Sequence, residues 1–263
     1  MKASSFFACL LLALVSVLFM LPVAALAAAT VSTGAGISFI RNFSDVITKA
    51  RTMQAFASGL SMSSAASALS IFLSTAAATA LSRRSDVASR SLISFILLLG
   101  GLPFSTLVIP LYFALFTLRL TDSVPVTVLF LAAANIPANV WIIERTLSEL
   151  PREAEETARL DGASMKDFLP RILLPQLAPV LTGSFITTFI NCWGNFIVPF
   201  ILLSSSHKMP AALAFFQAYS GAESGATGYL AAYAALYYLP VIALYLMLRL
   251  GMSRIFVLHR LKT

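Results

Sequence analysis

Charged residues are scarce in this 263-residue chain, at 11% of the total. Globular domains in water carry roughly a quarter charged residues, so the shortage argues against a soluble fold. Cysteine is also rare. Cys9 and Cys192 stand alone in apolar stretches, which is typical of inert core residues rather than of a disulfide or a metal site. The chain also lacks the G-x-x-x-x-G-K-[ST] phosphate loop, so we expect it to hydrolyse no ATP itself.

Long hydrophobic stretches take the place of the missing charge. Six windows contain no charged residue: 3–40, 52–82, 91–118, 123–143, 172–206 and 224–248. A helix needs about 20 apolar residues to cross the hydrocarbon core of a bilayer, and all six windows are long enough. They lack the alternation of barrel strands. We therefore predict an all-α, polytopic membrane protein, a single transmembrane domain over residues 1–263 with six spans near 6–29, 58–82, 92–117, 124–143, 178–203 and 229–248.

The distribution of Lys and Arg predicts the orientation. With the N-terminus in the cytoplasm, the inside segments hold 13 of the 18 Lys and Arg residues and the outside loops hold 5. Cytoplasmic loops carry the excess of positive charge. We therefore expect both termini in the cytoplasm, in a bacterial or archaeal plasma (inner) membrane. The net charge of +7 is explained by these membrane-boundary residues, which anionic lipid attracts, without nucleic acid as a partner.

The N-terminal segment has two interpretations. Lys2, the apolar run Phe6–Met20 and the Ala-rich stretch Ala24–Ala29 resemble a cleavable signal peptide. The run without charge continues to Arg41, however, which is longer than a signal needs and favours retention as the first span. Cleavage would leave five spans and place the new N-terminus outside. The sequence leaves both open.

Two features of the spans predict how they pack. Ala66, Ser70, Ser74, Ala78 and Ser82 recur every four residues and form a stripe along span two. Small residues let helices approach closely in lipid, so we expect a helix-packing face there. Pro103, Pro110 and Pro137 interrupt spans three and four and predict kinks. The external segment 30–57 is expected to hold a short helix around Phe39–Thr48.

The segment Glu144–Arg171 is the exception to the charge-poor pattern, with 12 of the 29 charged residues. Pro151 suits a first helical turn, and an acidic cluster follows it, which favours the positive end of a helix. Gly162 is placed to end that helix, and Ser164 with Asp167 to cap a second short one. A solvated loop explains the charge but not an ordered helix–Gly–helix unit.

The stretch Glu156-Thr157-Ala158-x3-Gly162-x9-Ile172-x-Leu174-Pro175 resembles the EAA loop of binding-protein-dependent ABC importer permeases. The family pattern is E-A-A, three residues, G, nine residues, I-x-L-P, and the spacing agrees throughout. Thr157 in place of Ala and Pro170 in the second helix depart from it. The similarity extends over nearly the whole chain and is greatest to the maltose-type carbohydrate permeases. It implies that residues 149–175 form a cytoplasmic coupling helix between helices 4 and 5.

The resemblance also implies partners. A second homologous permease would complete a heterodimer, two ATP-binding subunits would bind ATP and Mg, and an extracytoplasmic solute-binding protein would deliver the solute. This chain would bind no cofactor and no metal and have no catalytic residue. The residues expected to contact the ATPases are Glu155, Glu156, Ala158, Arg159, Asp161, Gly162 and Ala163. Membrane lipid surrounds the rest.

Polar residues inside the spans are candidates for the substrate pathway. Asn135 and Asn139 lie in span four, and Asn191, Trp193 and Asn195 in span five. An amide in hydrocarbon needs partners, so interhelical hydrogen bonding explains these residues equally well. We take Asn135, Asn191, Trp193 and Asn195 as pathway candidates, since aromatic faces and amides suit a sugar. The sequence does not distinguish which sugar or related solute is carried.

Two other classes of membrane protein compete with this interpretation. An ion-coupled secondary transporter or facilitator would usually carry ionisable groups within its spans, and the core of these six has none. A membrane enzyme is disfavoured because His207 and His259 both lie outside the predicted spans, so no buried Ser/His or metal constellation is evident. The permease interpretation is therefore preferred, with the secondary transporter as its alternative.

Overall fold

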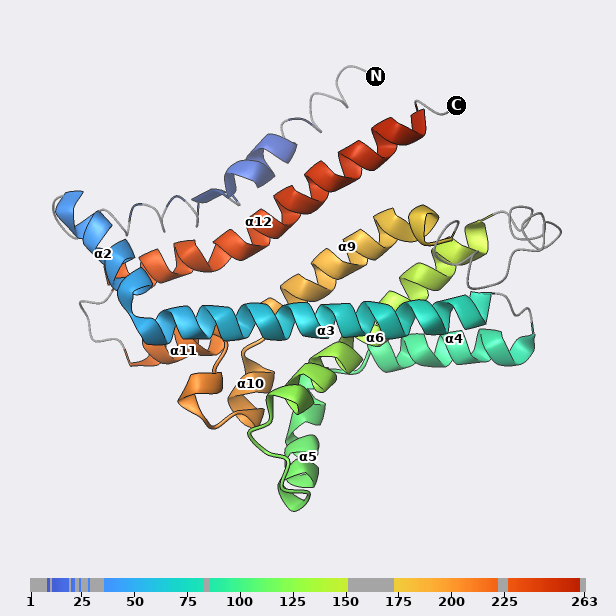
Figure 1. Ribbon diagram of the computed structural model, residues 1–263, viewed down its shortest axis with the longest axis horizontal. Coiled ribbons are helices and arrows are strands. Elements are labelled where there is room, and N and C mark those ends of the chain that lie inside the picture. The colour runs from blue at the N-terminus through green and yellow to red at the C-terminus, as the bar shows by residue number, and fades with distance from the viewer. Residues whose placement is uncertain are drawn as a thin grey trace.

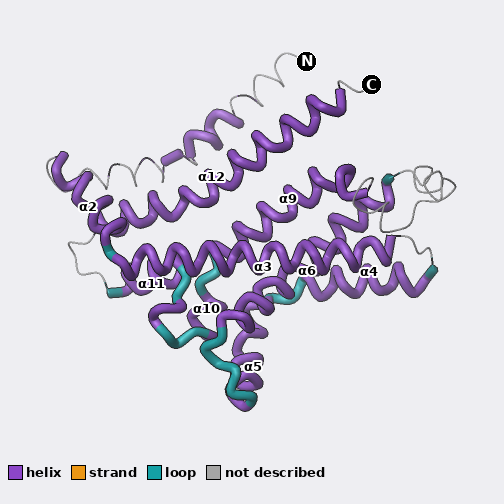
Figure 2. The backbone as a smooth tube through the Cα atoms, in the orientation of Figure 1, coloured by secondary structure: helices purple, strands orange, loops and turns teal. Residues whose placement is uncertain are grey.

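The structure is a computed structural model that describes residues 36–82, 86–150, 173–221 and 227–260, with scattered residues between 9 and 28. Within these ranges the chain is helical and has no strand (Figure 2). The helices in these ranges are, in chain order, α2 (Gly36–Thr48), α3 (Ala50–Ser82), α4 (Val87–Gly100), α5 (Phe104–Thr117), α6 (Val124–Glu149), α9 (Leu174–Trp193), α10 (Ile197–Leu202), the 3-10 turn η2 (Ser206–Lys208), α11 (Ala211–Ser220) and α12 (Thr227–Arg260).

Helix α3 is the centre of the bundle and packs most extensively against α6 and then α9 (Figure 1). Helix α4 packs on α6, and α12 packs on α2, α11 and α9. The C-terminal ends of α3, α6 and α12 and the N-terminal ends of α4 and α9 all lie toward the right of Figure 1. The segments predicted to be cytoplasmic therefore adjoin one end of the bundle.

The stripe of small residues on α3 is buried, as predicted. Ala66, Ser70, Ser74 and Ala78 have no exposed surface, and Ser82 is also buried. Ser74 Oγ donates to the carbonyl oxygen of Ile136 on α6 at 3.4 Å. Small side chains with short hydroxyls let α3 and α6 lie close together, because their backbones meet without bulky residues between them.

The short helix predicted before span two is also present. Helix α2 begins at Gly36 and ends at Thr48, which includes the predicted stretch 39–48. Val46 is fully buried in one cluster with Ala232 and Tyr233 of α12. Helix α3 then begins at Ala50, eight residues before the predicted span.

Two of the predicted spans are interrupted: span three beside Pro103, where an interruption was predicted, and span five at Gly194, where none was. The span expected at 92–117 is split into α4 and α5, because Gly101 and Leu102 close α4 with turn hydrogen bonds and Pro103 has no N–H to continue it. The span expected at 178–203 is split at Gly194, where α9 ends before α10 begins. At 1.5 Å per residue, α4 and α5 are each about 21 Å long, shorter than a bilayer core.

Among the described residues, three helices are long and apolar enough to cross a membrane by length and composition: Ala50–Ser82, Val124–Glu149 and Gly228–Leu248. Shorter apolar helices occur at Ser91–Gly100 and Thr106–Thr117. The count of six spans therefore stays a prediction, and so does the choice between retention and cleavage of residues 1–29. The single-domain boundary 1–263 likewise stays a prediction.

Large apolar side chains cover the outside of the bundle. Phe95 and Leu98 on α4, and Phe113 and Phe116 on α5, each expose more than half of their surface. In water, soluble proteins rarely expose apolar patches of this extent. Small residues inside and large apolar residues outside are the arrangement expected of a helical bundle in lipid.

Candidate functional site

The predicted ATPase-contacting residues lie outside the described residues. Glu155, Glu156, Ala158, Arg159, Asp161, Gly162 and Ala163 all fall between Glu149, where α6 ends, and Leu174, where α9 begins. Their role in coupling stays a prediction. The structure does describe the two helix ends that flank them.

These two helix ends are held together by one hydrophobic cluster. Ile143 and Leu147 of α6 pack against Leu173, just before α9, and Leu177 in its first turn. Ala78 of α3 completes the cluster. All five are at most 3% exposed. The helix ends on either side of residues 151–172 are therefore close-packed on each other and on α3.

A groove with a largely apolar surface and several amide and hydroxyl groups lies between α6 and α9. It has a volume of about 240 Å³. Its lining alternates polar and small or apolar side chains at helical spacing: Asn135, Ala138, Asn139 and Ile142 from α6, and Val180, Gly183, Ser184, Thr187, Thr188 and Asn191 from α9. None of these described lining residues is charged.

Asparagine amides on α6 tie the two helices together along this groove. Asn139 Nδ2 donates to Ser70 Oγ at 3.0 Å and to Thr188 Oγ1 at 2.9 Å, so it links α6 to both α3 and α9. Nearby, Asn191 Nδ2 donates to Asn135 Oδ1 at 3.1 Å. Asn135 in turn donates to the carbonyl oxygen of Leu131 at 2.9 Å. Buried amides satisfied in this way fix the spacing of helices in lipid.

The four predicted pathway residues divide into two pairs. Asn135 and Asn191 lie together in the groove. Trp193 instead is buried among aromatic rings, stacked on Tyr237 at 5.0 Å and on Phe189 at 5.9 Å between ring centroids. Asn195 Oδ1 accepts from the Val198 N–H at 3.0 Å and thereby starts α10. Trp193 and Asn195 thus have structural partners, and the pathway role of all four residues stays a prediction.

Trp193 and Tyr237 exchange hydrogen bonds across α9 and α12. Trp193 Nε1 donates to the carbonyl oxygen of Tyr237 at 3.2 Å, and Tyr237 Oη donates to the carbonyl oxygen of Trp193 at 2.5 Å. Trp193 is the last residue of α9, so its carbonyl has no partner within the helix. The phenol of Tyr237 supplies that partner and fixes the end of α9 on α12.

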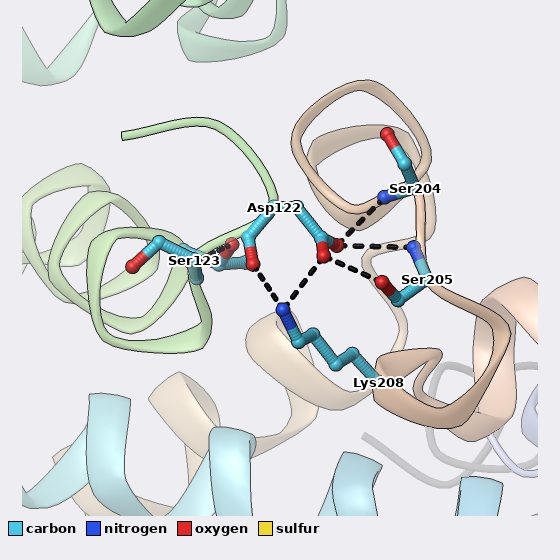
Figure 3. A network of polar contacts seen from close by, with 6 residues as sticks. Asp122, Ser123, Ser204, Ser205 and Lys208 are labelled. Carbon is cyan, nitrogen blue, oxygen red and sulfur yellow. Dashed lines mark hydrogen bonds and ion pairs between the residues drawn. The ribbon is translucent and has the colours of Figure 1, made fainter. Parts of the chain in front are cut away.

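A second polar network joins the loop before α6 to the segment after α10 (Figure 3). Asp122 precedes α6, and its carboxylate accepts from the backbone N–H groups of Ser204 and Ser205 at 2.9 and 3.0 Å. Ser205 Oγ and Lys208 Nζ donate to the other carboxylate oxygen at 2.5 and 2.6 Å. Lys208 Nζ also donates to the backbone carbonyl of Asp122 at 2.6 Å.

The network stabilises both the ionised form of the Asp122 carboxyl and the backbone conformation of this residue. The ammonium of Lys208, followed by the Ser205 and Ser204 donors, holds the pKa of the Asp122 carboxyl far below its usual range, and desolvation opposes this only partly. Asp122 also has a φ of 58°, in the left-handed region that Asp enters more readily than most residues. The carboxylate is therefore ionised at any physiological pH and holds its loop in an uncommon conformation.

Sequence reasoning missed Ser184, Thr187 and Thr188, although a signal was present. Ser184, Thr187, Thr188 and Asn191 have the spacing i, i+3, i+4, i+7, which places them on one face of α9. Asn135, Ala138, Asn139 and Ile142 have the same spacing on α6. The Asp122–Lys208 contact was missed because nothing in the local sequence pairs residues so far apart.

Comparison with protein families identifies the chain. The model of the family described as binding-protein-dependent transport system inner membrane component matches residues 70–257. That match runs from the middle of α3 to the end of α12 and includes the groove and the segment 151–172. The chain belongs to this permease family.

Individual permeases agree with this. The chain is 32% identical over 209 residues to the ORF1 ABC transporter permease protein of Streptomyces antibioticus, covering 75% of this chain and 90% of that protein. It is 27% identical over 184 residues to the diacetylchitobiose uptake system permease protein DasC of Streptomyces coelicolor, covering 68% of this chain and 65% of DasC. It is 28% identical over 176 residues to the trehalose transport system permease protein SugB of Mycobacterium tuberculosis, covering 66% of this chain and 64% of SugB.

Solved structures show the same permease fold. A bacterial ABC transporter involved in the import of the acidic polysaccharide alginate matches with a TM-score of 0.75 at 17% identity, over 94% of this chain and 96% of that one. The alginate transporter in complex with its alginate pentasaccharide-bound periplasmic protein matches with a TM-score of 0.68 at 12% identity, over 93% of both chains. The likeness over nearly the full length of each chain shows that the fold is shared.

Proposed function

We propose that this permease forms, together with a second homologous permease, the translocation pathway of an ATP-driven importer for a carbohydrate or related solute. The observation that supports this most strongly is the family match over 70–257, because it includes both the helices of the groove and the segment that resembles the EAA loop. The alternative, an ion-coupled carrier, has no specific observation in its favour.

Carbohydrate is the proposed substrate class for two reasons. Relatives are named for uptake of diacetylchitobiose, trehalose and maltodextrin. The groove between α6 and α9 offers amides and hydroxyls against apolar walls. Sugars present hydroxyls along their edges and C–H groups on their faces, so such a lining matches them in chemistry.

The proposed partners follow from what this chain lacks and what it resembles. It has no phosphate loop, so two separate ATP-binding subunits would bind ATP and Mg and carry out hydrolysis. A solute-binding protein outside the plasma membrane would deliver the carbohydrate. This chain would then be no enzyme, but one half of a heterodimeric pore.

The segment 149–175 is proposed as the coupling element. Its flanks are packed into one cluster by Leu147 and Leu173, so movement at the ATPase would be passed to α6 and α9 together. Those two helices also line the groove. Closure of the ATPases would thereby change the width of the groove.

The proposed topology places this segment and both termini in the cytoplasm. The Asp122–Lys208 network would then lie at the outer surface, where the binding protein arrives. This follows from the positive-inside distribution of Lys and Arg, which is supported by the gathering of the corresponding helix ends at one end of the bundle (Figure 1).

Affinity purification tests the proposal. A tagged chain extracted from its native membrane is expected to bring down an ATP-binding subunit and a second permease, and the purified complex is expected to hydrolyse ATP. An ion-coupled carrier would purify alone and show no ATPase activity.

A further inference from the structure

Helix α2 has more apolar surface than its neighbours cover. It lies at the end of the bundle where α3 and α12 begin, and it packs on both (Figure 1). Val46 is fully buried against α12, and Phe43 packs against the same cluster. Ile40 and Ile47 are seven residues apart and so share one face of the helix, yet they expose 71% and 51% of their surface. The apolar face of α2 thus continues beyond its contact with α12.

Positive charge lies beside this apolar face. Arg41, Lys49 and Arg51 are exposed, and none of the three forms an ion pair with a described residue. Asp45 is the one carboxylate in the same stretch of the sequence, so the segment is basic. A helix that is apolar on one side and carries Lys and Arg on the other is typical of a segment that lies in the plane of a membrane surface.

Lys49 indicates the depth at which this segment lies. Its Nζ is 4.1 Å from the centroid of the Tyr229 ring, and Tyr229 Oη lies 3.4 Å from Thr52 Oγ1. Tyr229 is at the start of the apolar stretch Gly228–Leu248 of α12, which at 1.5 Å per residue is about 31 Å long and matches the hydrocarbon core. Tyrosine also favours the boundary between hydrocarbon and water. The ammonium of Lys49 therefore lies at the level of the lipid headgroups.

An anionic phospholipid complements both features of this surface. Its phosphate meets the cations, and its acyl chains cover the isoleucines, so one molecule satisfies the charge and the apolar face together. An uncharged solute would leave the cations without a counter-charge. Each Lys or Arg near an anionic bilayer surface strengthens the attraction about fivefold, so three such cations distinguish strongly between anionic and zwitterionic lipid.

We propose that α2 is an interfacial anchor on the outer leaflet, with Ile40 and Ile47 among the acyl chains, and that Arg41, Lys49 and Arg51 bind the headgroups of anionic phospholipid. Because α2 packs on the start of α12 and adjoins α3, the anchor holds the outer ends of both helices at the membrane surface. The inference uses the proposed topology only to name the leaflet, and it rests neither on the solute nor on the ATPase.

Photo-crosslinking in the full complex tests what covers this face. The photoreactive residue p-benzoylphenylalanine is placed at position 40 or 47, and its adducts are identified by mass spectrometry after irradiation of intact cells and of the complex in lipid nanodiscs. Position 45 is the matched control, because it is exposed and lies two residues before 47, on the opposite side of the helix. We expect phospholipid adducts at 40 and 47 that are at least fivefold more abundant than at 45.

The role of the cations is tested in nanodiscs of equal parts phosphatidylglycerol and phosphatidylcholine. The lipid captured at position 47 should be enriched in phosphatidylglycerol about fivefold or more, which is the factor that one boundary cation supplies. Arg41→Gln combined with Lys49→Gln should lower this enrichment to below about twofold. Arg41→Lys combined with Lys49→Arg keeps both charges at the same two positions and should leave the enrichment unchanged.

Three results would overturn the proposal. Adducts at 40 and 47 to a protein, whether the solute-binding protein, the second permease or this chain itself, would mean that a protein covers the apolar face. No adduct at either position, while the same residue at position 98 on the exposed side of α4 reacts, would mean that α2 stands in water. Equal capture of the two lipids would remove the role of the cations. Crosslinking needs neither ATP nor solute, so its failure is distinct from a failure of ATP-driven uptake, which would contradict the proposed function.

Discussion

Asp122 Oδ2 lies 2.6 Å from Lys208 Nζ, although the two residues are 86 positions apart in the chain. Their contact joins the loop before α6 to the turn η2 (Figure 3). Asp122 lies directly before α6, one of the two helices that line the groove. Lys208 lies in η2, which follows the other lining helix, α9, after the short helix α10. The pair therefore ties the start of α6 to the segment that follows α10.

Removing the charge of Asp122 is expected to destabilise the protein. Asp122→Asn keeps the size of the side chain and tolerates the same φ, but it weakens the bonds from Lys208 and the two serines. Hydrogen bonds to a charged group contribute about 1.5–3 kcal/mol, so the midpoint of thermal unfolding in detergent should fall by several degrees. Asp45→Asn on the exposed face of α2 is the control and should leave the midpoint unchanged.

The stabilisation by Asp122 should depend on pH in one direction. Lys208 and the serine donors lower the pKa of this carboxyl in the folded state, so its contribution is complete above the unfolded pKa of about 3.9. It is lost only as pH falls from there through the lower folded value. The difference in midpoint between wild type and Asp122→Asn should be constant from pH 7 to pH 5. A difference that already shrinks between pH 7 and pH 5 would contradict the network.

The hydroxyl of Tyr237 should matter more than that of its neighbour. Tyr237→Phe leaves the carbonyl at the end of α9 without its partner and should cost about 0.5–1.5 kcal/mol, measured as a lower unfolding midpoint. Tyr238→Phe is the matched control, because Tyr238 is 58% exposed and makes only a ring contact with Tyr237. Equal effects of the two substitutions would show that the bond between α12 and α9 contributes nothing.

Two glycines should respond to alanine in opposite ways. A Cβ at Gly59 on α3 would lie 3.1 Å from both Ala211 N and Trp193 Cζ3, so Gly59→Ala should destabilise by about 1–3 kcal/mol. Gly183 on α9 has open space instead, and Gly183→Ala should be neutral or stabilise by about 0.5–1 kcal/mol through helix propensity. Unfolding midpoints of the two variants, measured side by side, decide this. A destabilised Gly183→Ala would mean that the groove is filled.

The coupling segment is tested by Gly162→Asp. A charged, branched residue at the expected helix break should uncouple ATP hydrolysis from uptake, while the protein still inserts in the membrane. Uptake and ATPase activity are measured on the same proteoliposomes. Gly221→Asp adds the same charge in an exposed outer position and should transport normally. Normal uptake by Gly162→Asp would count heavily against a docking role for this segment.

The helical bundle was predictable because hydropathy and charge distribution are local properties of the sequence. The stripe Ala66–Ser82 and the short helix α2 were both found in this way. Pro103 was predicted to interrupt span three, and α4 does end just before it, but the break at Gly194 was not predicted. Gly-Gly-Leu-Pro at 100–103 is a strong chain breaker, so the first break was available from the sequence.

The contacts within the site were harder to predict from the sequence. Helical spacing alone places Ser184 on the same face as Asn191, but it does not reveal that Oγ lacks a partner, since this depends on how α6 and α9 pack. The environment of Trp193 likewise depends on α12, which follows 34 residues later. The coupling residues lie outside the described parts of the chain, so Glu156 and Gly162 rest on the sequence resemblance.

The most direct test of the central claim is solute uptake by the purified complex in proteoliposomes. We expect ATP-dependent accumulation of a neutral oligosaccharide that requires this chain, a second permease and intact ATP-binding subunits, and that stops when the ATPase is inactivated. Uptake by this chain alone, driven by an ion gradient and indifferent to ATP, would contradict the account.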